Sequence, residues 1–310
     1  MARLFDIWDT DFEMKEDWVD QVLPSLSRTR PILIAGPTAS GKSALAMALA
    51  RRDGRVIVNA DALQVYARWR ILTARPSMED EAEADHQLYG HIGRDAPYSV
   101  GHWLREVACV LAAGKPVVIV GGSGLNLTAL TTGLAAIPAT PPHVRAAADL
   151  RKTRDGVAAM LADLDAETAA LIDRANPARI QRAWEVLQTT GRGLVEWQAA
   201  TPPALVPMAK ADALVLRPDV TWLNTRIDGR FDAMISLGAM DEVAAELPHW
   251  DASQPSAQAI GAPELISHLR GETSLDTAIA ASKLASRQYA KRQRTWLRSK
   301  MSAWRDISLP

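Results

Sequence analysis

The segment from 36 to 43 has the composition of a phosphate-binding loop. Such loops have two glycines around four residues, followed by Lys and Ser or Thr, and the chain matches with Gly36-Pro37-Thr38-Ala39-Ser40-Gly41-Lys42-Ser43. The backbone N–H groups of such a loop point inward, and the helix that follows adds the positive end of its dipole. Lys42 would reach the terminal phosphates, and Ser43 would ligate a Mg²⁺ ion. We therefore expect a di- or triphosphate to bind here; a glycine turn with a coincidental Lys-Ser pair is the alternative.

The loop does not by itself decide which reaction takes place. Kinases, hydrolases and alkyl transferases can all use it, and the hydrolases usually have an acid at the end of a later strand that holds the metal-bound water. The later strand here ends in Val120-Gly121-Gly122-Ser123-Gly124, without an acid. Hydrolysis of the motor or switch kind is therefore disfavoured.

A carboxylate follows the second expected strand, in Asp61-Ala62-Leu63-Gln64-Val65-Tyr66. In an open parallel sheet the loops beyond the carboxyl ends of the strands line the ligand crevice, so Asp61 is expected to face the phosphate loop. There it could bind a metal or accept a proton from an attacking group. It could equally cap a helix that begins at Ala62, and the chemistry alone weighs the two roles evenly.

The run from 283 to 300 contains seven Lys and Arg residues and no acid. If the run is helical, spacings of 4, 3 and 4 put on one face Arg287, Lys291, Arg294 and Arg298. RNA phosphates are natural partners for such a face, with Gln288 and Trp296 near enough to bond or pack against a splayed base. A solvated helix face is the alternative.

Short apolar runs alternate with helical patterns along most of the chain. We expect strands over 31–36, 55–60, 116–122, 213–216 and 307–309, and a helix over 43–50. Helices between strands are typical of a parallel sheet with right-handed crossovers. The sequence therefore predicts an α/β fold, a P-loop NTPase-like parallel sheet flanked by helices, with a helical insertion subdomain.

The insertion is expected where the strand pattern stops. Prolines bound an alanine-rich helical stretch that is broken at Asn176-Pro177. The expected segments are an acidic N-terminal helical extension, 1–28; the first part of the core, 29–137; the helical insertion, 138–205; and the second part of the core with the basic C-terminal helix, 206–310.

Composition narrows the class of protein. Lys and Arg number 35 against 36 Asp and Glu, so the net charge predicts no partner. The single cysteine, Cys109, excludes a disulfide framework. No apolar run approaches 18 residues and the amino end has no signal core. We expect a cytoplasmic protein with no membrane contact.

Together these blocks resemble the tRNA dimethylallyltransferase family. The resemblance also rests on Thr73-Ala74-Arg75-Pro76 and on Ser286-Arg287-Gln288-Tyr289-Ala290-Lys291-Arg292-Gln293-Arg294-Thr295-Trp296-Leu297-Arg298, and the blocks run from about 31 to 300 in the family's order. It implies transfer of a dimethylallyl group from dimethylallyl diphosphate to N6 of the adenosine 3′ of the anticodon (position 37) in tRNA, with release of diphosphate. The implied cofactor is Mg²⁺, the implied partners are tRNA and dimethylallyl diphosphate, and a monomer is expected.

The resemblance also implies roles for single residues. Asp61 would accept the proton of the amine, while Lys42 and Arg226 would stabilise the leaving diphosphate, with Thr38 nearby; for Arg226 a solvated helix arginine is the alternative. The insertion would face the tRNA, with the target base flipped into a pocket between it and the sheet. The residues assigned to tRNA binding are Asp61, Ala62, Leu63, Gln64, Ser123, Arg145, Arg179, Gln181, Arg182, Arg287, Gln288, Lys291 and Arg294.

The chain departs from the family's usual residues at three positions, Ala62, Asn126 and Ala262. The usual residues there are Ser, Tyr and Tyr, and all three positions are expected to face RNA or the prenyl group. A catalytically weakened RNA-binding relative is therefore one alternative function. A P-loop small-molecule kinase is the other, although it gives no reason for the basic helix.

Overall fold

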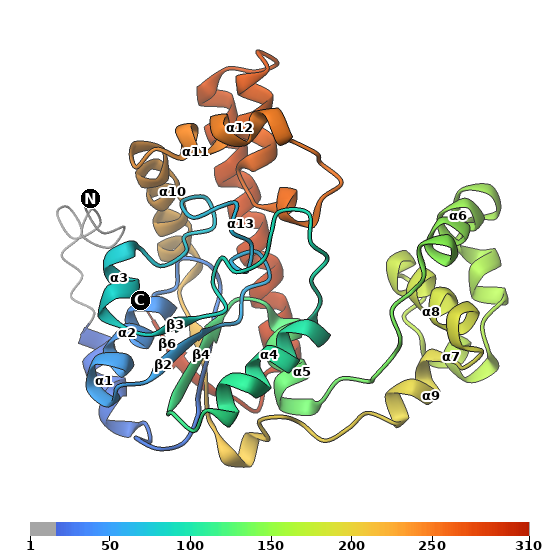
Figure 1. The fold of residues 1–310 in the computed structure, drawn as a ribbon, viewed down its shortest axis with the longest axis horizontal. Helices are drawn as coiled ribbons and strands as arrows, with labels where there is room; N and C mark the ends of the chain where they lie inside the picture. The colour runs from blue at the N-terminus through green and yellow to red at the C-terminus, as the bar shows by residue number, and fades with distance from the viewer. Residues whose placement is uncertain (1–16, 310) are drawn as a thin grey trace. The chain divides into compact units, whose positions relative to one another are not determined.

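The computed structural model describes residues 17–309. The described chain divides into two compact units: one is formed by the chain up to Thr131 and from Leu205 onward, and the other is Thr132–Ala204 (Figure 1). Of the expected acidic extension, residues 1–16 lie outside the described residues. The remainder, 17–28, contains helix α1 (Asp17–Val22) and the 3-10 helix η1 (Leu23–Ser25).

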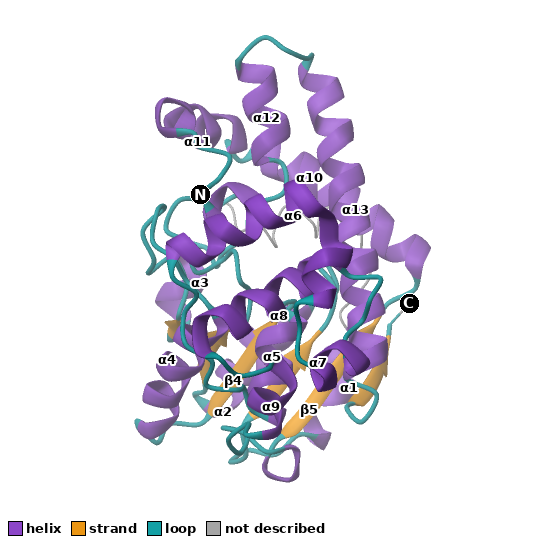
Figure 2. Ribbon diagram, turned by 90° about the vertical axis from the view of Figure 1, so that its right-hand side faces the viewer, coloured by secondary structure: helices purple, strands orange, loops and turns teal. Residues whose placement is uncertain are grey.

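The first unit is built on a parallel sheet. Within residues 17–309 the sheet has six strands in the order β3-β2-β4-β1-β5-β6, and every neighbouring pair is parallel (orange in Figure 2). Their bounds are β1 (Ile32–Ala35), β2 (Val56–Asn59), β3 (His86–Gln87), β4 (Val117–Gly121), β5 (Asp212–Arg217) and β6 (Arg305–Ser308). The predicted parallel α/β fold is confirmed. Strand β3 was not expected, because two polar residues give no apolar run.

Helices cover both faces of this sheet. The helices of this unit after α1 are α2 (Lys42–Asp53), α3 (Met78–Glu83), α4 (Val100–Ala112), α5 (Gly124–Thr132), α10 (Val220–Ser236), α11 (Ala239–Glu246), α12 (Ala262–Leu269) and α13 (Leu275–Lys300). Trp103 of α4 and Leu297 of α13 pack on one face of the sheet, while Leu45 and Leu49 of α2 pack on the other. Burial of these apolar side chains is what holds the helices to the strands.

Helices α10 to α13 form a smaller apolar cluster with the segment that follows β2. Trp69 and Leu72 from that segment pack with Phe231 and Leu265. Ala262 lies inside this cluster and is fully buried. The expectation that Ala262 faces RNA or the prenyl group is therefore wrong, because apolar packing surrounds it. Asn126, in α5, is also buried, with 4% of its surface exposed.

The regular secondary structure of the second unit is all α-helix. It contains α6 (Pro142–Ala162), α7 (Ala166–Leu171), α8 (Pro177–Thr190) and α9 (Leu194–Ala199), packed around a core that includes Ala148, Met160 and Trp184. Helix α8 begins at the Asn-Pro break noted in the sequence, where the Asn176 side chain accepts a hydrogen bond from the Arg179 N–H. The unit begins six residues before the expected start of the insertion.

The end of β4 leaves no room for a side chain. A Cβ on Gly121 would lie 2.2 Å from the carbonyl oxygen of Ala60, and a backbone atom cannot move aside cheaply. We expect Gly121→Ala to reduce the free energy of unfolding by about 1–3 kcal/mol and to lower the melting temperature in calorimetry. Gly93→Ala is the control, because nothing lies within 4 Å of its Cβ position; equal melting temperatures for the two variants would contradict the expectation.

Candidate active site

The phosphate-binding loop joins β1 to α2, as the sequence predicts. Ala39 (φ +61°) and Gly41 (φ +84°) both adopt left-handed backbone conformations, and Gly41 is the N-cap of α2. These two residues turn the chain so that the 12-residue helix α2 begins at the loop. An anion at this point would meet the positive end of the helix dipole and its unpaired N–H groups.

Three cationic side chains meet at the loop. Lys42 Nζ donates to the carbonyl oxygen of Pro37 at 2.7 Å. Arg226 Nε donates to the carbonyl oxygen of Ala39 at 3.1 Å, so the structure brings Arg226 to the loop as expected. Arg230, one turn further along α10, donates to Thr38 Oγ1. Sequence reasoning missed Arg230, although its i, i+4 spacing from Arg226 was a usable signal.

Burial, together with repulsion between neighbouring cations, changes the titration of Lys42 and Arg230. Burial, with Arg230 adding to it, lowers the pKa of Lys42 to about 7, while Asp61 acts in the opposite direction. Burial also lowers the pKa of Arg230 to about 10, where Asp61 opposes and Arg226 reinforces the shift. A bound polyanion would relieve the repulsion and favour both charged forms. The site therefore has the electrostatic character of a polyanion site.

Asp61 is held in a tight turn beside these cations. The Asp61 N–H donates to Asn59 Oδ1 at 2.7 Å, and Asp61 Oδ1 accepts from the Leu63 N–H at 2.9 Å. Turns, and no α-helix, follow Asp61, so the helix-cap alternative is wrong and the carboxylate closes a turn instead. Asn59, which is fully buried, positions Asp61 and was missed because a single strand-end amide carries no spacing signal.

Several residues expected to hold the target nucleotide also support the backbone. Ser123 Oγ accepts from the Ala62 N–H at 2.8 Å. Gln64 Nε2 donates to the carbonyl oxygens of Thr73 and Ala74, at 2.8 and 2.9 Å. These bonds tie the Asp61 turn to the segments around it. Leu63 is half-buried and Ala62 is exposed, and nucleotide contacts for this group stay a prediction.

The inner face of α13 contributes two side chains that were not predicted. Gln293 Oε1 accepts from the Thr38 N–H at 2.8 Å, and Gln293 Nε2 donates to the Gly122 carbonyl oxygen at 3.1 Å. Burial, and then the nearby Asp61 carboxylate, raise the pKa of Tyr289. Both residues lie inside the basic run. Their 4-residue spacing, which puts two polar side chains on one helix face, was the available signal.

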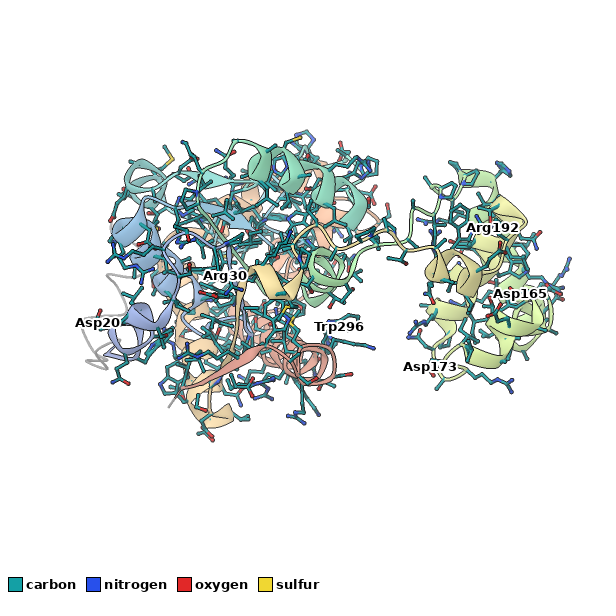
Figure 3. All side chains as sticks on the ribbon, turned by 90° about the horizontal axis from the view of Figure 1, so that it is seen from below. Asp20, Arg30, Asp165, Asp173, Arg192 and Trp296 are labelled. Atoms are coloured by element: carbon teal, nitrogen blue, oxygen red, sulfur yellow. The ribbon has the colours of Figure 1, made fainter. Side chains whose placement is uncertain are left out.

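The outer face of α13 is less positive than its sequence suggests. Asp228 of α10 pairs with Arg287, and Asp232 pairs with Lys283 at 2.7 Å. Lys291 is exposed and Arg294 is half-buried. Other exposed side chains of α13 are Gln288, Arg298 and Trp296. Trp296 is labelled in Figure 3. The exposed positive charge of α13 is thus concentrated toward the carboxyl end of the helix.

In the second unit, the expected RNA-facing residues lie on α6 and α8. Glu185, 4% exposed, lies 3.9 Å from the Arg145 guanidinium and 3.6 Å from that of Arg182. Gln181 Nε2 donates to Asp149 Oδ1 at 2.7 Å. Arg179 is exposed at the first turn of α8. Segment 178–182 is thus helical, and its contacts with RNA stay a prediction.

The residues at the loop fit a magnesium ion that arrives with its phosphates. The Ser43 side chain is exposed at the start of α2, where a hydroxyl ligand is needed. Among residues 17–309 there is no group of three or more His, Cys, Asp or Glu side chains that could hold a metal. Mg²⁺ is commonly held by few protein ligands and completed by waters and substrate phosphates, so Ser43 would be its protein ligand here.

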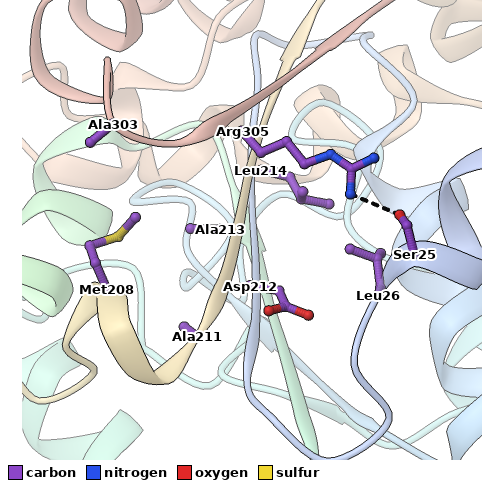
Figure 4. Close-up of a pocket in the computed structure, with 9 residues that line it drawn as sticks. All are labelled: Ser25, Leu26, Met208, Ala211, Asp212, Ala213, Leu214, Ala303 and Arg305. Atoms are coloured by element: carbon purple, nitrogen blue, oxygen red, sulfur yellow. Dashed lines mark hydrogen bonds between the residues drawn. The ribbon is translucent and has the colours of Figure 1, made fainter.

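A separate hollow of about 300 Å³ lies away from this site (Figure 4). Its lining includes Asp212 at the start of β5 and Arg305, which donates to Ser25 Oγ at 2.8 Å. Asp212 pairs in register with Ile32, the first residue of β1, whereas the phosphate loop follows the last. The hollow therefore lies at the amino-terminal ends of these strands, and the phosphate loop lies at their carboxyl ends.

In the described part of the chain, no helix has the length and apolar character needed to cross a membrane.

Comparisons with known proteins show which family and fold the chain resembles. A family model described as IPP transferase matches residues 64–300, and one described as isopentenyl transferase matches 30–91. A tRNA dimethylallyltransferase of Cereibacter sphaeroides (strain ATCC 17029 / ATH 2.4.9) is 64% identical over 288 residues, which are 93% of this chain and 92% of the relative. Solved structures are similar as well. The crystal structure of a tRNA delta(2)-isopentenylpyrophosphate transferase from Staphylococcus epidermidis matches with a TM-score of 0.62 and 27% identity, and the match covers 90% of this chain and 92% of that one. A eukaryotic dimethylallyltransferase acting on tRNA shares the fold, with a TM-score of 0.77, 22% identity, and coverage of 90% and 74%.

The lowered pKa of Lys42, about 7, gives a testable proton balance. At pH 8 roughly nine-tenths of Lys42 is neutral in the free protein, and a bound anion favours the ammonium form. We expect pyrophosphate binding at pH 8 to take up more protons in the wild type than in Lys42→Met, by up to about one proton. Calorimetry in buffers of different ionisation enthalpy measures the proton uptake of each protein. Subtracting the value for Lys42→Met from that for the wild type removes the protons that pyrophosphate itself releases. Equal uptake by both proteins would show that Lys42 does not titrate on binding.

Proposed function

The chain belongs to the tRNA dimethylallyltransferase family, and from this premise we propose that it transfers a dimethylallyl group from dimethylallyl diphosphate to N6 of the adenosine 3′ of the anticodon (position 37) of tRNA. The observation that carries the proposal is the cluster of Lys42, Arg226 and Arg230 around the phosphate loop, with Asp61 beside it. A small-molecule kinase is not retained, because the family match extends over the whole basic carboxyl-terminal run.

The cation cluster is suited to a leaving diphosphate. In the proposed reaction the bond between C1 of the dimethylallyl group and the diphosphate oxygen breaks, and its electron pair stays on that oxygen. Lys42, Arg226 and Arg230 stabilise the negative charge that develops there, and they are oriented before the substrate arrives. A Mg²⁺ ion held by Ser43 and the phosphates would add further positive charge.

Asp61 supports the second half of the reaction. The N6 lone pair forms the new C–N bond, so the nitrogen must lose a proton. The Leu63 N–H fixes the carboxylate through Oδ1, and we assign Oδ2 as the atom that accepts the proton. Ser123 bonds to the same turn through the Ala62 N–H, and Tyr289 lies near both Asp61 and Ser123.

We propose that tRNA binds along the exposed end of α13 and on the helical unit. Lys291 and Arg298 supply the positive charge that acidic neighbours on α10 leave free. Arg179 is the exposed cation that begins α8. The adenosine would have to leave its stack to reach Asp61, as in other enzymes that act on a base.

The direct test is incubation of the protein with unmodified tRNA, dimethylallyl diphosphate and Mg²⁺, followed by nuclease digestion and mass spectrometry of the nucleosides. The proposal predicts an adenosine carrying one added dimethylallyl group, and only when all three components are present. Absence of any modified adenosine, or phosphorylation of a small acceptor from ATP, would contradict it.

Replacing Asp61 separates chemistry from binding. Asp61→Asn keeps the side-chain shape and the Leu63 contact but cannot accept the proton as well, so we expect kcat to fall about 10²–10⁴-fold. The Kd for tRNA, from fluorescence anisotropy, should stay within about twofold of wild type. Asp20→Asn, an exposed carboxylate on α1 (Figure 3), is the control. A kcat close to wild type in Asp61→Asn would rule out the assigned base.

The salt dependence of tRNA binding tests α13 itself. If Lys291 contacts one phosphate, Lys291→Ala should reduce the slope of log K against log[salt] by about 0.7–0.9. Lys115→Ala is the matched control, because Lys115 is also an exposed lysine but lies before β4, 3.5 Å from Asp85. The proposal for α13 is wrong if both variants keep the wild-type slope.

A further inference from the structure

One peptide unit of the phosphate loop, between Pro37 and Thr38, is held from both sides. Its N–H, on Thr38, donates to Gln293 Oε1 at 2.8 Å. Its carbonyl oxygen, on Pro37, accepts from Lys42 Nζ at 2.7 Å. Because the unit is planar and trans, its N–H and C=O point in opposite directions. Fixing the N–H therefore also fixes the direction in which the carbonyl meets Lys42.

Gln293 is itself fixed in one orientation. Its side chain is 6% exposed, and its Nε2 donates to the Gly122 carbonyl oxygen at 3.1 Å. The amide can satisfy a donor on Thr38 and an acceptor on Gly122 in only one way, so a flipped amide would lose both bonds. A Cβ on Gly122 would lie 2.1 Å from Gln293 Nε2, which shows how closely α13 approaches the end of β4.

We propose that Gln293 is a positioning residue for the diphosphate, which it serves by orienting the Pro37–Thr38 peptide and, through it, the Lys42 ammonium. This inference rests on the proposed function and adds to it a residue on the buried face of the RNA-binding helix. Gln293 bonds to the loop backbone, so its effect on the reaction passes through Lys42 and through Thr38.

The Pro37–Thr38 peptide links Gln293 to two of the three cations at the loop. Its carbonyl oxygen accepts from Lys42 Nζ. Thr38 has a second function, since its hydroxyl accepts from Arg230. Loss of the Gln293 bond would free the peptide to rotate and would disturb both cations. Lys291, on the exposed side of the same helix, would keep its place.

Gln293→Met tests the proposal because methionine is unbranched and of similar size but makes neither bond. We expect the Kd for pyrophosphate with Mg²⁺ to rise on the order of tenfold, which corresponds to about 1.4 kcal/mol. The KM for dimethylallyl diphosphate should rise in parallel, and the Kd for tRNA should stay within about twofold. Gln21→Met, at an exposed position of α1, is the matched control. Unchanged pyrophosphate binding, or equal losses for pyrophosphate and tRNA, would overturn the proposal.

A double-mutant cycle distinguishes positioning from general damage to the fold. If Gln293 acts through Lys42, then Gln293→Met should weaken pyrophosphate binding clearly less in a Lys42→Met background than in the wild type. Full additivity would overturn the proposal. If Gln293→Met lowers the melting temperature too far for assay, Gln293→Asn replaces it, since its shorter amide cannot reach both partners. The cycle measures pyrophosphate binding alone, so it remains decisive even if the protein transfers no dimethylallyl group.

Discussion

The site depends on holding three positively charged side chains close together beside the phosphate loop. Lys42, Arg226 and Arg230 crowd against segment 36–43, and burial makes the charges of Lys42 and Arg230 costly. What offsets this cost is a set of backbone and hydroxyl acceptors: Pro37 O, Ala39 O and Thr38 Oγ1. The arrangement is preorganised for an anion, because the donors stand in place before any ligand neutralises them.

The order of the strands brings the parts of the site together at the carboxyl ends of the strands. Strands β2, β4 and β1 are neighbours, and they are followed respectively by Asp61, Ser123 and the phosphate loop. Helix α10 follows β5, the other neighbour of β1, and delivers the two arginines. Residues far apart in sequence thus meet because parallel strands end side by side, as is general for open α/β sheets.

Sequence patterns predicted what is encoded locally. The phosphate loop, the apolar strands and the position of Asp61 after β2 each follow from short runs of residues, and Arg226 follows from a family motif. Contacts across the fold could not be predicted in this way. Asp228 neutralises Arg287 from another helix, so an acid-free run was not a uniformly basic surface.

Gln293 shows the same limit from the other side. It stands among arginines and lysines and was given no role from the sequence, whereas packing of α13 against the end of β4 turns this side chain inward to the loop. Likewise Ala262 was expected to face a ligand, but the packing of α10 to α13 buries it. Burial is set by tertiary contacts. A single sequence predicts which residues share a helix face, but it does not predict which elements pack against that face.

The central claim is that the loop and its cations hold the diphosphate next to Asp61. A crystal structure of the protein with pyrophosphate and Mg²⁺ tests it most directly. We expect phosphate oxygens within hydrogen-bonding distance of Lys42, Arg226 and Arg230, with the Asp61 carboxylate facing the bound anion. Pyrophosphate bound elsewhere, for instance in the hollow beside Arg305, with the loop and its three cations left unliganded, would contradict the account.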